Sequence, residues 1–469
     1  MLNTLSGQDN PAQAQNAPAA AMPQLMQQRL LEAVQRGHWV MAGLPLSFPA
    51  RLLYGFPAML AEGLTVVISP TPSRVQSQKV HFGNEGMRFP AMAVLDGSQT
   101  PHEQRDIYQQ INHNQVRLLC VTPKVFGTLN FLNALVHASL RGVVVEDAQG
   151  LLPDFSTAAV YAPVLNALHK LQQKPPLVLI TQPLPQARQK ELLSLLWGNP
   201  DRKTAMAMPG LQRLSRPVMP HLAGMTVARC LTEYQKLTRL VAWLNHRQQG
   251  SPGAVPVVIQ TATRRDADRL SIALQRQGLS AVFKLHPQQT REQQAQIVDH
   301  ARGQPGAVVL VSGTEDWFAL FHSLAAPGEK LGMVYWQVPV CLEEAAARLF
   351  RAYGRQEAFV DGLLLYTRED YRDAMDRLSL HEAGAGPEAV GHRTALKRLR
   401  AWVLSRRCRF LSLLAYIQDE RDPMLAETAE GLQPCGRCDV CLEQRGALPL
   451  ADLLWAAMMR LTPLARRFY

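Results

Sequence analysis

The chain has 469 residues, of which 47% are hydrophobic and 19% charged, and its 49 Lys and Arg exceed its 38 Asp and Glu, giving a formal net charge of +11. This is ordinary globular composition, and the length suggests about three domains with sizeable cores. The positive charge favours a polyanionic partner, either nucleic acid or an anionic membrane surface. No apolar run reaches the roughly 18 residues of a membrane span, and the polar N-terminus shows no secretory signal. We therefore expect a cytoplasmic protein, nucleoid-associated if bacterial, that does not bind membranes.

The first half of the chain alternates strand-like and helix-like segments. Residues 1–22 are rich in Ala, Gln, Asn and Pro and are expected to form a disordered leader. Apolar residues at helical spacing predict a helix over 24–36. Short β-like runs, each followed by a helical stretch, then predict a doubly wound parallel sheet. These runs cover residues 64–69, 116–122, 142–145 and 177–181. The proline-containing stretch 209–220 is interpreted as a linker.

A second alternating block follows. Its predicted strands cover residues 257–260, 281–284, 308–312, 333–338 and 362–366. A helix is expected over 264–277 between the first two of them. The pattern predicts two tandem α/β lobes, 23–215 and 216–370. A mainly helical segment over 371–445 and a short basic and apolar tail over 446–469 complete the chain.

Three cysteines crowd into seven residues near the end of the chain. Cys435, Cys438 and Cys441 lie in C-G-R-C-D-V-C, and Cys408 lies upstream in R-R-C-R-F. Because cytosolic cysteines stay reduced, such a cluster indicates metal ligands before disulfides. Four thiolates complete a tetrahedral zinc shell with no open position, which indicates structural zinc rather than catalytic zinc. The other cysteines stand in strand-like or apolar contexts and are expected in the core: Cys120, Cys230 and Cys341.

The cysteine pattern, with two segments of the first lobe, resembles RecQ-family DNA helicases. Residues 37–78, which include Y-G-F-P-A-M-L-A-E-G-L-T-V-V-I-S-P, are similar to the segment that carries motifs I and Ia. Residues 118–126, L-L-C-V-T-P-K-V-F, resemble the strand and turn that follow. The resemblance covers about residues 23–445. It implies two RecA-like lobes and a helical zinc-binding subdomain, and in the family these perform ATP-dependent 3′–5′ DNA unwinding.

The phosphate-binding loop departs from the family pattern. Where the family has T-G-G-G-K-S after a proline, this chain has L-S-F-P-A-R after Pro45. Phe48 and Pro49 prevent the backbone from cradling phosphates, because the loop needs glycines and free N–H groups. Ala50 stands at the position of the lysine and Arg51 at that of the Mg²⁺-binding hydroxyl. Arg51 is left as a weak candidate for phosphate contact.

The other nucleotide-site motifs are altered as well. The family's Asp-Glu-Ala-His corresponds here to Glu-Asp-Ala-Gln, so Glu146 and Asp147 exchange the two acids. Arg351 matches the first arginine of motif VI, whereas the second, which acts as the arginine finger, is absent in register and Arg355 lies one residue away. Gln27 has the spacing of the adenine-reading glutamine, although an exposed helix glutamine explains it equally well. We expect these to be vestiges, with zinc as the cofactor and with neither ATP nor Mg²⁺ bound.

Basic residues crowd the helical stretch before the cysteines. They are Arg393, Lys397, Arg398, Arg400, Arg406, Arg407 and Arg409, with Trp402 among them. A helix places Arg393, Lys397 and Arg400 on one face, where a basic stripe can follow a phosphate backbone. The alternative is a solvated helix face. The apolar positions of the tail suit a helix docked on a protein partner or, with more support, on the chain's own core.

Three hypotheses follow. The first is a DNA-binding pseudo-helicase with little or no ATP hydrolysis, which acts on single-stranded or junction-containing DNA as a scaffold or regulator in repair, recombination or defence. The second is an active helicase with a divergent nucleotide site. The third is a protein–protein adaptor that binds no nucleic acid.

Overall fold

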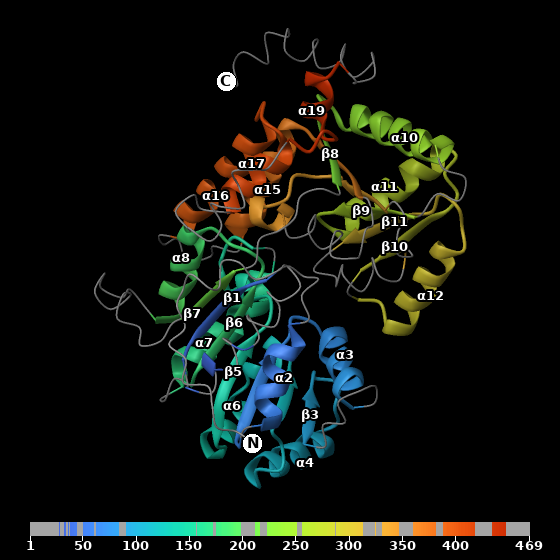
Figure 1. Ribbon diagram of the computed structural model, residues 1–469. Coiled ribbons are helices and arrows are strands. Elements are labelled where there is room, and N and C mark those ends of the chain that lie inside the picture. The colour runs from blue at the N-terminus through green and yellow to red at the C-terminus, as the bar shows by residue number, and fades with distance from the viewer. Residues whose placement is uncertain are drawn as a thin grey trace.

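Two parallel β-sheets, each flanked by helices, form the frame of the molecule (Figure 1). The computed structural model describes 38–44, 50–60, 62–83, 91–155, 157–171, 175–197, 212–215, 223–250, 256–286, 288–312, 331–346, 360–380, 388–417 and 434–446, with a few isolated residues besides. Several predictions fall outside these residues: the 1–22 leader, the loop 45–49, Gln27, Arg351, Arg355 and the tail beyond residue 446.

The first sheet has seven strands in the order β3-β4-β2-β5-β6-β1-β7. The strands are β1 (Val40–Gly43), β2 (Leu64–Ile68), β3 (Met92–Leu95), β4 (Leu118–Val121), β5 (Leu140–Val145), β6 (Leu177–Thr181) and β7 (Gln212–Ser215). All pairings are parallel. The interior strand β2, with sequence L-T-V-V-I, is buried along its whole length because helices cover both faces of a parallel sheet.

Helices connect the strands of the first lobe. They are α2 (Arg51–Leu60), α3 (Pro72–Gly83), α4 (Pro101–Asn112), α5 (Pro123–Phe126), α6 (Leu129–His137), α7 (Ala158–Lys170) and α8 (Gln186–Trp197), with a 3₁₀ turn η2 (Ala148–Leu151) after β5. The prolines at the first turns of α4 and α5 fit positions whose N–H has no partner within the helix.

The four strands predicted for this lobe are confirmed, but the linker interpretation of 209–220 is wrong at residues 212–215. These residues form β7, which pairs in parallel with β1 so that Gln212 lies opposite Val40. Its sequence, Q-R-L-S, has only one large apolar residue, because an edge strand has less surface to bury. The sequence therefore carried no strand signal there. The strands β1 and β3 were also missed.

The second sheet has six parallel strands in the order β10-β11-β9-β12-β13-β8. They are β8 (Ala223–Arg229), β9 (Val257–Thr261), β10 (Val282–Leu285), β11 (Val308–Ser312), β12 (Leu331–Tyr335) and β13 (Val360–Tyr366). The helices are α10 (Glu233–Gly250), α11 (Arg264–Arg276), α12 (Arg291–Arg302) and α15 (Arg368–Leu380). The five predicted strands are confirmed, and the edge strand β8 is an addition.

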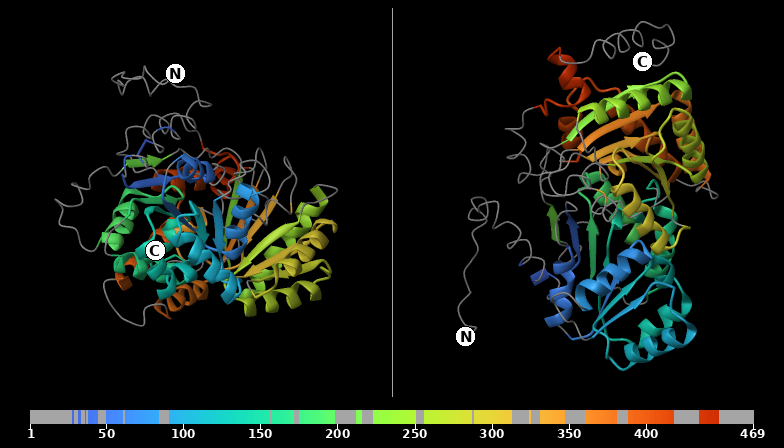
Figure 2. Two further views of the ribbon diagram at one scale, coloured as in Figure 1. Left: turned by 90° about the horizontal axis from the view of Figure 1, so that it is seen from below. Right: turned by 90° about the vertical axis from the view of Figure 1, so that its right-hand side faces the viewer.

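The C-terminal helices pack against the second lobe, and the right view of Figure 2 shows the red segment that carries α19 beside the strands of that lobe. They are α16 (Glu388–Val403), α17 (Arg409–Ile417) and α19 (Asp439–Gln444). Leu399, Phe410 and Leu413 share one apolar core with Met333 and Tyr335 of β12. Among the described helices, none combines the length and the apolar character that a membrane-spanning helix needs.

Candidate functional site

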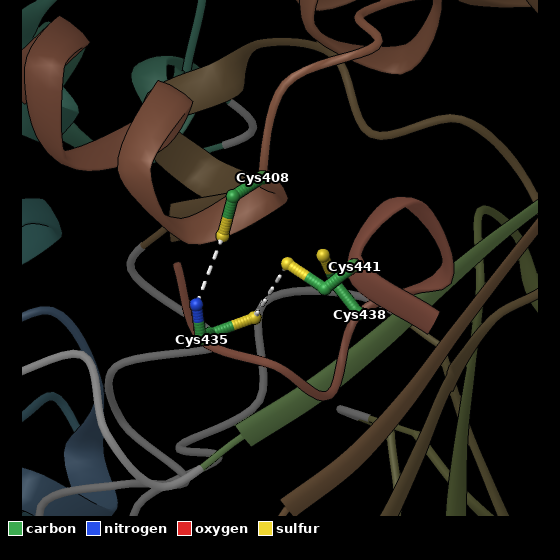
Figure 3. Close-up of side chains that lie close together, drawn as sticks. All are labelled: Cys408, Cys435, Cys438 and Cys441. Carbon is green, nitrogen blue, oxygen red and sulfur yellow. Dashed lines mark hydrogen bonds between the residues drawn. The ribbon is translucent and has the colours of Figure 1, made fainter. Parts of the chain in front are cut away.

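The four predicted cysteines converge from two segments (Figure 3). Cys408 lies directly before α17, Cys435 and Cys438 lie in the loop before α19, and Cys441 lies on α19. One ligand atom from each lies within 4.8 Å of those of the others. The Sγ atoms of Cys435 and Cys441 are 3.9 Å apart. The structure thus brings together residues that are up to 33 positions apart in the sequence (441 − 408).

This geometry fits a tetrahedral metal ion. Four sulfurs at about 2.3 Å from a central zinc lie roughly 3.8 Å from one another. The backbone N–H of Cys435 donates to Sγ of Cys408 at 3.3 Å, and that of Arg409 donates to Sγ of Cys438 at 3.5 Å. Hydrogen bonds among the sulfurs hold the pKa of Cys408 well below its ordinary value and raise the pKa of Cys435 and of Cys438, so they do not favour the thiolate at every sulfur. The donor set is therefore four sulfurs with N–H groups that favour thiolates, which suits a soft ion such as zinc.

Arg409 organises the protein around the cysteines. Its guanidinium binds both carboxylate oxygens of Asp439, with Nε–Oδ1 at 2.9 Å and Nη2–Oδ2 at 2.8 Å. It also donates to the carbonyl oxygens of Trp402 at 2.6 Å and Val403 at 3.0 Å. The carbonyls at the end of α16 are thereby joined to the first turn of α19, so Arg409 fixes the spacing of the segments that carry the cysteines.

This arrangement corrects part of the predicted nucleic-acid surface. Trp402 is only 4% exposed, and its indole N–H donates to the carbonyl of Arg409 at 3.0 Å. Arg409 is 5% exposed. Neither side chain can stack on a base or contact a phosphate. The sequence spacing gave no sign of this, because burial of a basic side chain depends on a partner 30 residues away.

The remaining basic residues of the predicted nucleic-acid surface differ in their exposure. Lys397, Arg400, Arg406 and Arg407 are exposed. Arg398 is half-buried and donates to the hydroxyl of Tyr416 at 3.4 Å. Arg393 lies on α16, and its side chain is outside the described residues. The exposed basic surface is therefore smaller than the sequence predicted, and we call its four members, Lys397, Arg400, Arg406 and Arg407, the basic surface.

A second candidate site lies where β5 ends, at the acid pair. Glu146 is 1% exposed. Its Oε1 accepts hydrogen bonds from the Tyr54 hydroxyl at 2.9 Å and from Nε2 of Gln78 at 3.1 Å. Its Oε2 accepts from the Ser69 hydroxyl at 2.7 Å. Burial, and then the charge of Glu146, hold the pKa of Tyr54 well above its usual value, so the phenol stays a donor.

A guanidinium from α3 lies between the two acids. Nε of Arg74 is 3.2 Å from Oε2 of Glu146, and its Nη1 is 2.8 Å from Oδ2 of Asp147. Asp147 adopts a left-handed backbone with φ of 49°, and its Oδ1 accepts from Nε2 of Gln149 at 3.2 Å. The charge of Glu146 and Asp147 is therefore partly neutralised by Arg74, and other side chains of the protein donate hydrogen bonds to both carboxylates. Sequence reasoning found the acids but missed Arg74, whose only signal was its place two residues after Pro72 at the start of a helix.

Arg51, the other weak nucleotide-site candidate, opens α2. Its Nη2 donates to the hydroxyl of Ser77 on α3 at 3.3 Å. Ala50 precedes it and is half-buried. At the position where the resemblance has a metal-binding hydroxyl, this chain therefore has an arginine side chain held against α3.

Comparison with known proteins gives two bacterial helicases as distant relatives of this chain. No family model matches the chain. It is 22% identical over 420 residues to the ATP-dependent DNA helicase RecQ of Haemophilus influenzae, covering 89% of this chain and 61% of the relative. It is 23% identical over 397 residues to that of Pasteurella multocida, covering 84% and 56%. The chain thus spans little more than half the length of these relatives.

A solved structure shares the fold. The DEAD-box helicase Mss116 bound to single-stranded RNA superposes with a TM-score of 0.54 at 12% identity, covering 85% of this chain and 91% of that one. The two sheets are therefore tandem RecA-like lobes, as expected from the sequence, followed by a helical subdomain with four clustered cysteines. The chain is RecQ-like in sequence and has a helicase fold.

Proposed function

We propose that this protein is a RecQ-like DNA-binding protein that hydrolyses little or no ATP and acts as a scaffold or regulator. The observation that carries the proposal is Arg74, whose guanidinium contacts both Glu146 and Asp147. In the resemblance these acids stand at the Mg²⁺ and water-activating positions. Here a cation that belongs to the chain already lies against them.

The charge at the acid pair explains why this arrangement opposes catalysis. Phosphoryl transfer depends on a metal ion that neutralises the developing charge on the phosphates. A dication approaching Glu146 has to displace the Arg74 guanidinium and three neutral donors from a side chain that is 1% exposed. The phosphate-loop sequence adds to this barrier, because Pro49 lacks an N–H and Ala50 lacks a charge.

DNA binding is supported by charge and by the relatives. The net charge is +11, and the basic surface lies beside the cysteine centre on α16 and the turn that follows it. The two bacterial relatives are named ATP-dependent DNA helicases. We propose that single-stranded or junction-containing DNA follows the basic surface, that the four cysteines hold structural zinc, and that residues 446–469 contact a protein partner or the chain's own core. Repair, recombination or defence is the proposed setting, in the cytoplasm or nucleoid.

The test combines two measurements on the zinc-loaded protein. ATP hydrolysis is measured with and without single-stranded DNA, and the expected rate equals the enzyme-free background in both cases. DNA-stimulated turnover on the order of 1 s⁻¹, within the ordinary enzyme range, overturns the proposal in favour of an active helicase.

DNA affinity is measured across a salt series. We expect the double variant Arg406→Gln/Arg407→Gln to lower the slope of log K against log salt by about 1 to 1.5, since each phosphate contact on a single strand contributes about 0.7. A matched double variant in the first lobe, Arg105→Gln/Lys170→Gln, should leave the slope unchanged; both residues are exposed and lie outside the basic surface. Absence of salt-dependent binding overturns DNA binding and favours the adaptor hypothesis.

A further inference from the structure

A buried ionic cluster joins the two lobes. Arg188 on α8 of the first lobe has a side chain that is 3% exposed, and its Nε lies 3.0 Å from Oε1 of Glu343 in the second lobe. Glu343 lies on the helical turn 342–346, has a side chain that is 1% exposed, and follows β12. Arg188 also pairs with Asp154 and with Glu191, both in its own lobe. The guanidinium is thus shared between one partner across the lobe boundary and two within the first lobe.

The helical subdomain reaches the same carboxylate. The hydroxyl of Tyr416 on α17 donates to Oε1 of Glu343 at 2.6 Å, and Arg398 on α16 donates to that hydroxyl at 3.4 Å. One oxygen of Glu343 therefore lies between a guanidinium of the first lobe and a phenol of the C-terminal helices. In Figure 1, α8 lies directly below α16, at the place where the three parts of the molecule meet.

Neutral contacts reinforce the junction. Nε2 of Gln182, directly after β6, donates to the backbone carbonyl of Glu343 at 2.9 Å. Cys341, two residues before Glu343, is fully buried and packs into the apolar core of the first lobe. The second lobe therefore inserts residues 340–346 between the first sheet and α17, with both polar and apolar contacts.

The electrostatics make this junction costly to open. Three carboxylates surround one guanidinium, and the negative field of Asp154, Glu343 and Glu191 outweighs burial and raises the pKa of Arg188. Burial raises the pKa of Asp154 as well. If the lobes separate, Arg188 keeps Asp154 and Glu191, but Glu343 loses its guanidinium partner. The Glu343 carboxylate must then be rehydrated or left without a counter-ion, and breaking a buried pair is strongly unfavourable.

We propose that Arg188, Glu343 and Tyr416 form an interlobe lock, which holds both lobes and the helical subdomain in one arrangement whether or not nucleotide is present. A two-lobed enzyme that cycles needs hinge or shear movement between its lobes. The interlobe lock instead makes the relative position of the lobes a fixed property of the fold. It would present any bound partner with a surface of constant shape, and it does not depend on whether that partner is DNA.

The experiment measures the distance between the lobes in the full-length, zinc-loaded protein. Fluorophores are attached through non-canonical amino acids at Val136 on α6 and Ile272 on α11, which are 74% and 51% exposed. This labelling leaves the cysteines untouched. Single-molecule energy transfer should give the wild type one narrow distance distribution that ATP with Mg²⁺ does not shift. A nucleotide-dependent second population in the wild type overturns the proposal.

Two variants and a matched control test the residues. Glu343→Gln removes the charge across the boundary with little change in volume, and it should raise the opening equilibrium constant about a hundredfold. Glu191→Gln alters the same arginine's partner within the first lobe, where Glu191 has a side chain that is 35% exposed, and should leave the distribution unchanged. Equal distributions for Glu343→Gln and Glu191→Gln overturn the proposal.

If Glu343→Gln fails to fold, Tyr416→Phe provides the test, because it removes one hydroxyl and leaves every charge in place. Loss of that hydrogen bond to a carboxylate should raise the opening constant about tenfold. Unfolding monitored by circular dichroism shows that the variant is native. A native Tyr416→Phe protein with the wild-type distance distribution overturns the role of α17 in the interlobe lock.

Discussion

The cysteine centre and the acid pair of the first lobe are both sets of metal-ligating side chains at the ends of structural elements, yet they differ in what surrounds the ligands. The four sulfurs face one another, and backbone N–H groups donate to two of them, Cys408 and Cys438. The oxygens of Glu146 instead face Tyr54, Ser69, Gln78 and Arg74. The four cysteines could hold a metal ion, whereas the acid pair already has the Arg74 guanidinium as its counter-ion.

This difference shows that the presence of metal-ligating residue types, such as Cys, Asp and Glu, in a sequence does not by itself define a metal site. Negative groups in a protein interior must be compensated, and either a metal ion or a side chain can do so. At the cysteines, the guanidinium of Arg409 is committed to Asp439 and to two carbonyls. At the acid pair, Arg74 is directed at the acids themselves. Which cation compensates each cluster is decided by the placement of one arginine.

Loss of the metal should have the largest effect. Cys438→Ser, or chelation of the wild type, should abolish binding of about one zinc per chain and unfold α17 and α19, because structural zinc contributes on the order of 10 kcal/mol to such folds. Metal analysis and hydrogen exchange of α17 and α19 measure this. Cys230→Ala, at a buried cysteine outside the cluster, is the control and should keep the zinc. A full zinc complement in Cys438→Ser would contradict the four-ligand assignment.

Removal of Arg409 should come next. Arg409→Met leaves Asp439 and two carbonyls without their donor, and we expect a loss of about 4 kcal/mol in the free energy of unfolding. Arg406→Met, at an exposed arginine on the same segment, should change it by less than about 0.5 kcal/mol. Denaturant unfolding measures both. Similar losses in the two variants would mean that Arg409 contributes only as a surface charge.

Removal of Arg74 tests the role of this arginine at the acid pair. Arg74→Met should cost about 3 kcal/mol, because Glu146 is left charged and buried with neutral donors alone. Since the chain's own cation is then absent, millimolar Mg²⁺ should raise the melting temperature of the variant and leave that of the wild type unchanged. Equal Mg²⁺ responses in the two proteins would show that Arg74 does not exclude the metal.

The smallest expected change in stability concerns Asp96, a carboxylate of the first lobe whose hydrogen-bond donors are all neutral. Burial raises the pKa of Asp96, but hydrogen bonds from Gln76, Ser98 and Gln99 outweigh burial and hold the pKa below its ordinary value of 3.8. Its stabilising contribution is therefore present above pH 3.8 and is lost as the pH falls through the lower folded-state pKa. Asp96→Asn should be less stable than the wild type at pH 7, and the difference should shrink at about pH 3. Urea unfolding at both values checks this, and a difference that does not vary with pH would contradict it.

Much of the fold was predictable because it rests on local patterns. Continuous apolar runs such as L-V-L-I-T at 177–181 predicted buried parallel strands, and β6 has those bounds. Cys120, Cys230 and Cys341 were expected in the core and are buried there. The edge strand β7 was missed because its sequence, Q-R-L-S, is mostly polar. The strands β1, β3 and β8 were missed as well, although β1 is an interior strand, because their short apolar runs were not distinguished from the neighbouring segments.

The sequence by itself determined the two α/β lobes, the grouping of Cys408 with Cys435, Cys438 and Cys441, and the exchange of the two acids at 146 and 147. Only the tertiary structure decided which basic side chains are free and which are internal counter-ions. Arg74, Arg188 and Arg409 look alike in sequence to Lys397 or Arg406, yet each lies against carboxylates brought to it by another part of the chain. The physical reason is that periodicity records burial of apolar area, whereas the pairing of buried charges depends on contacts between residues distant in sequence.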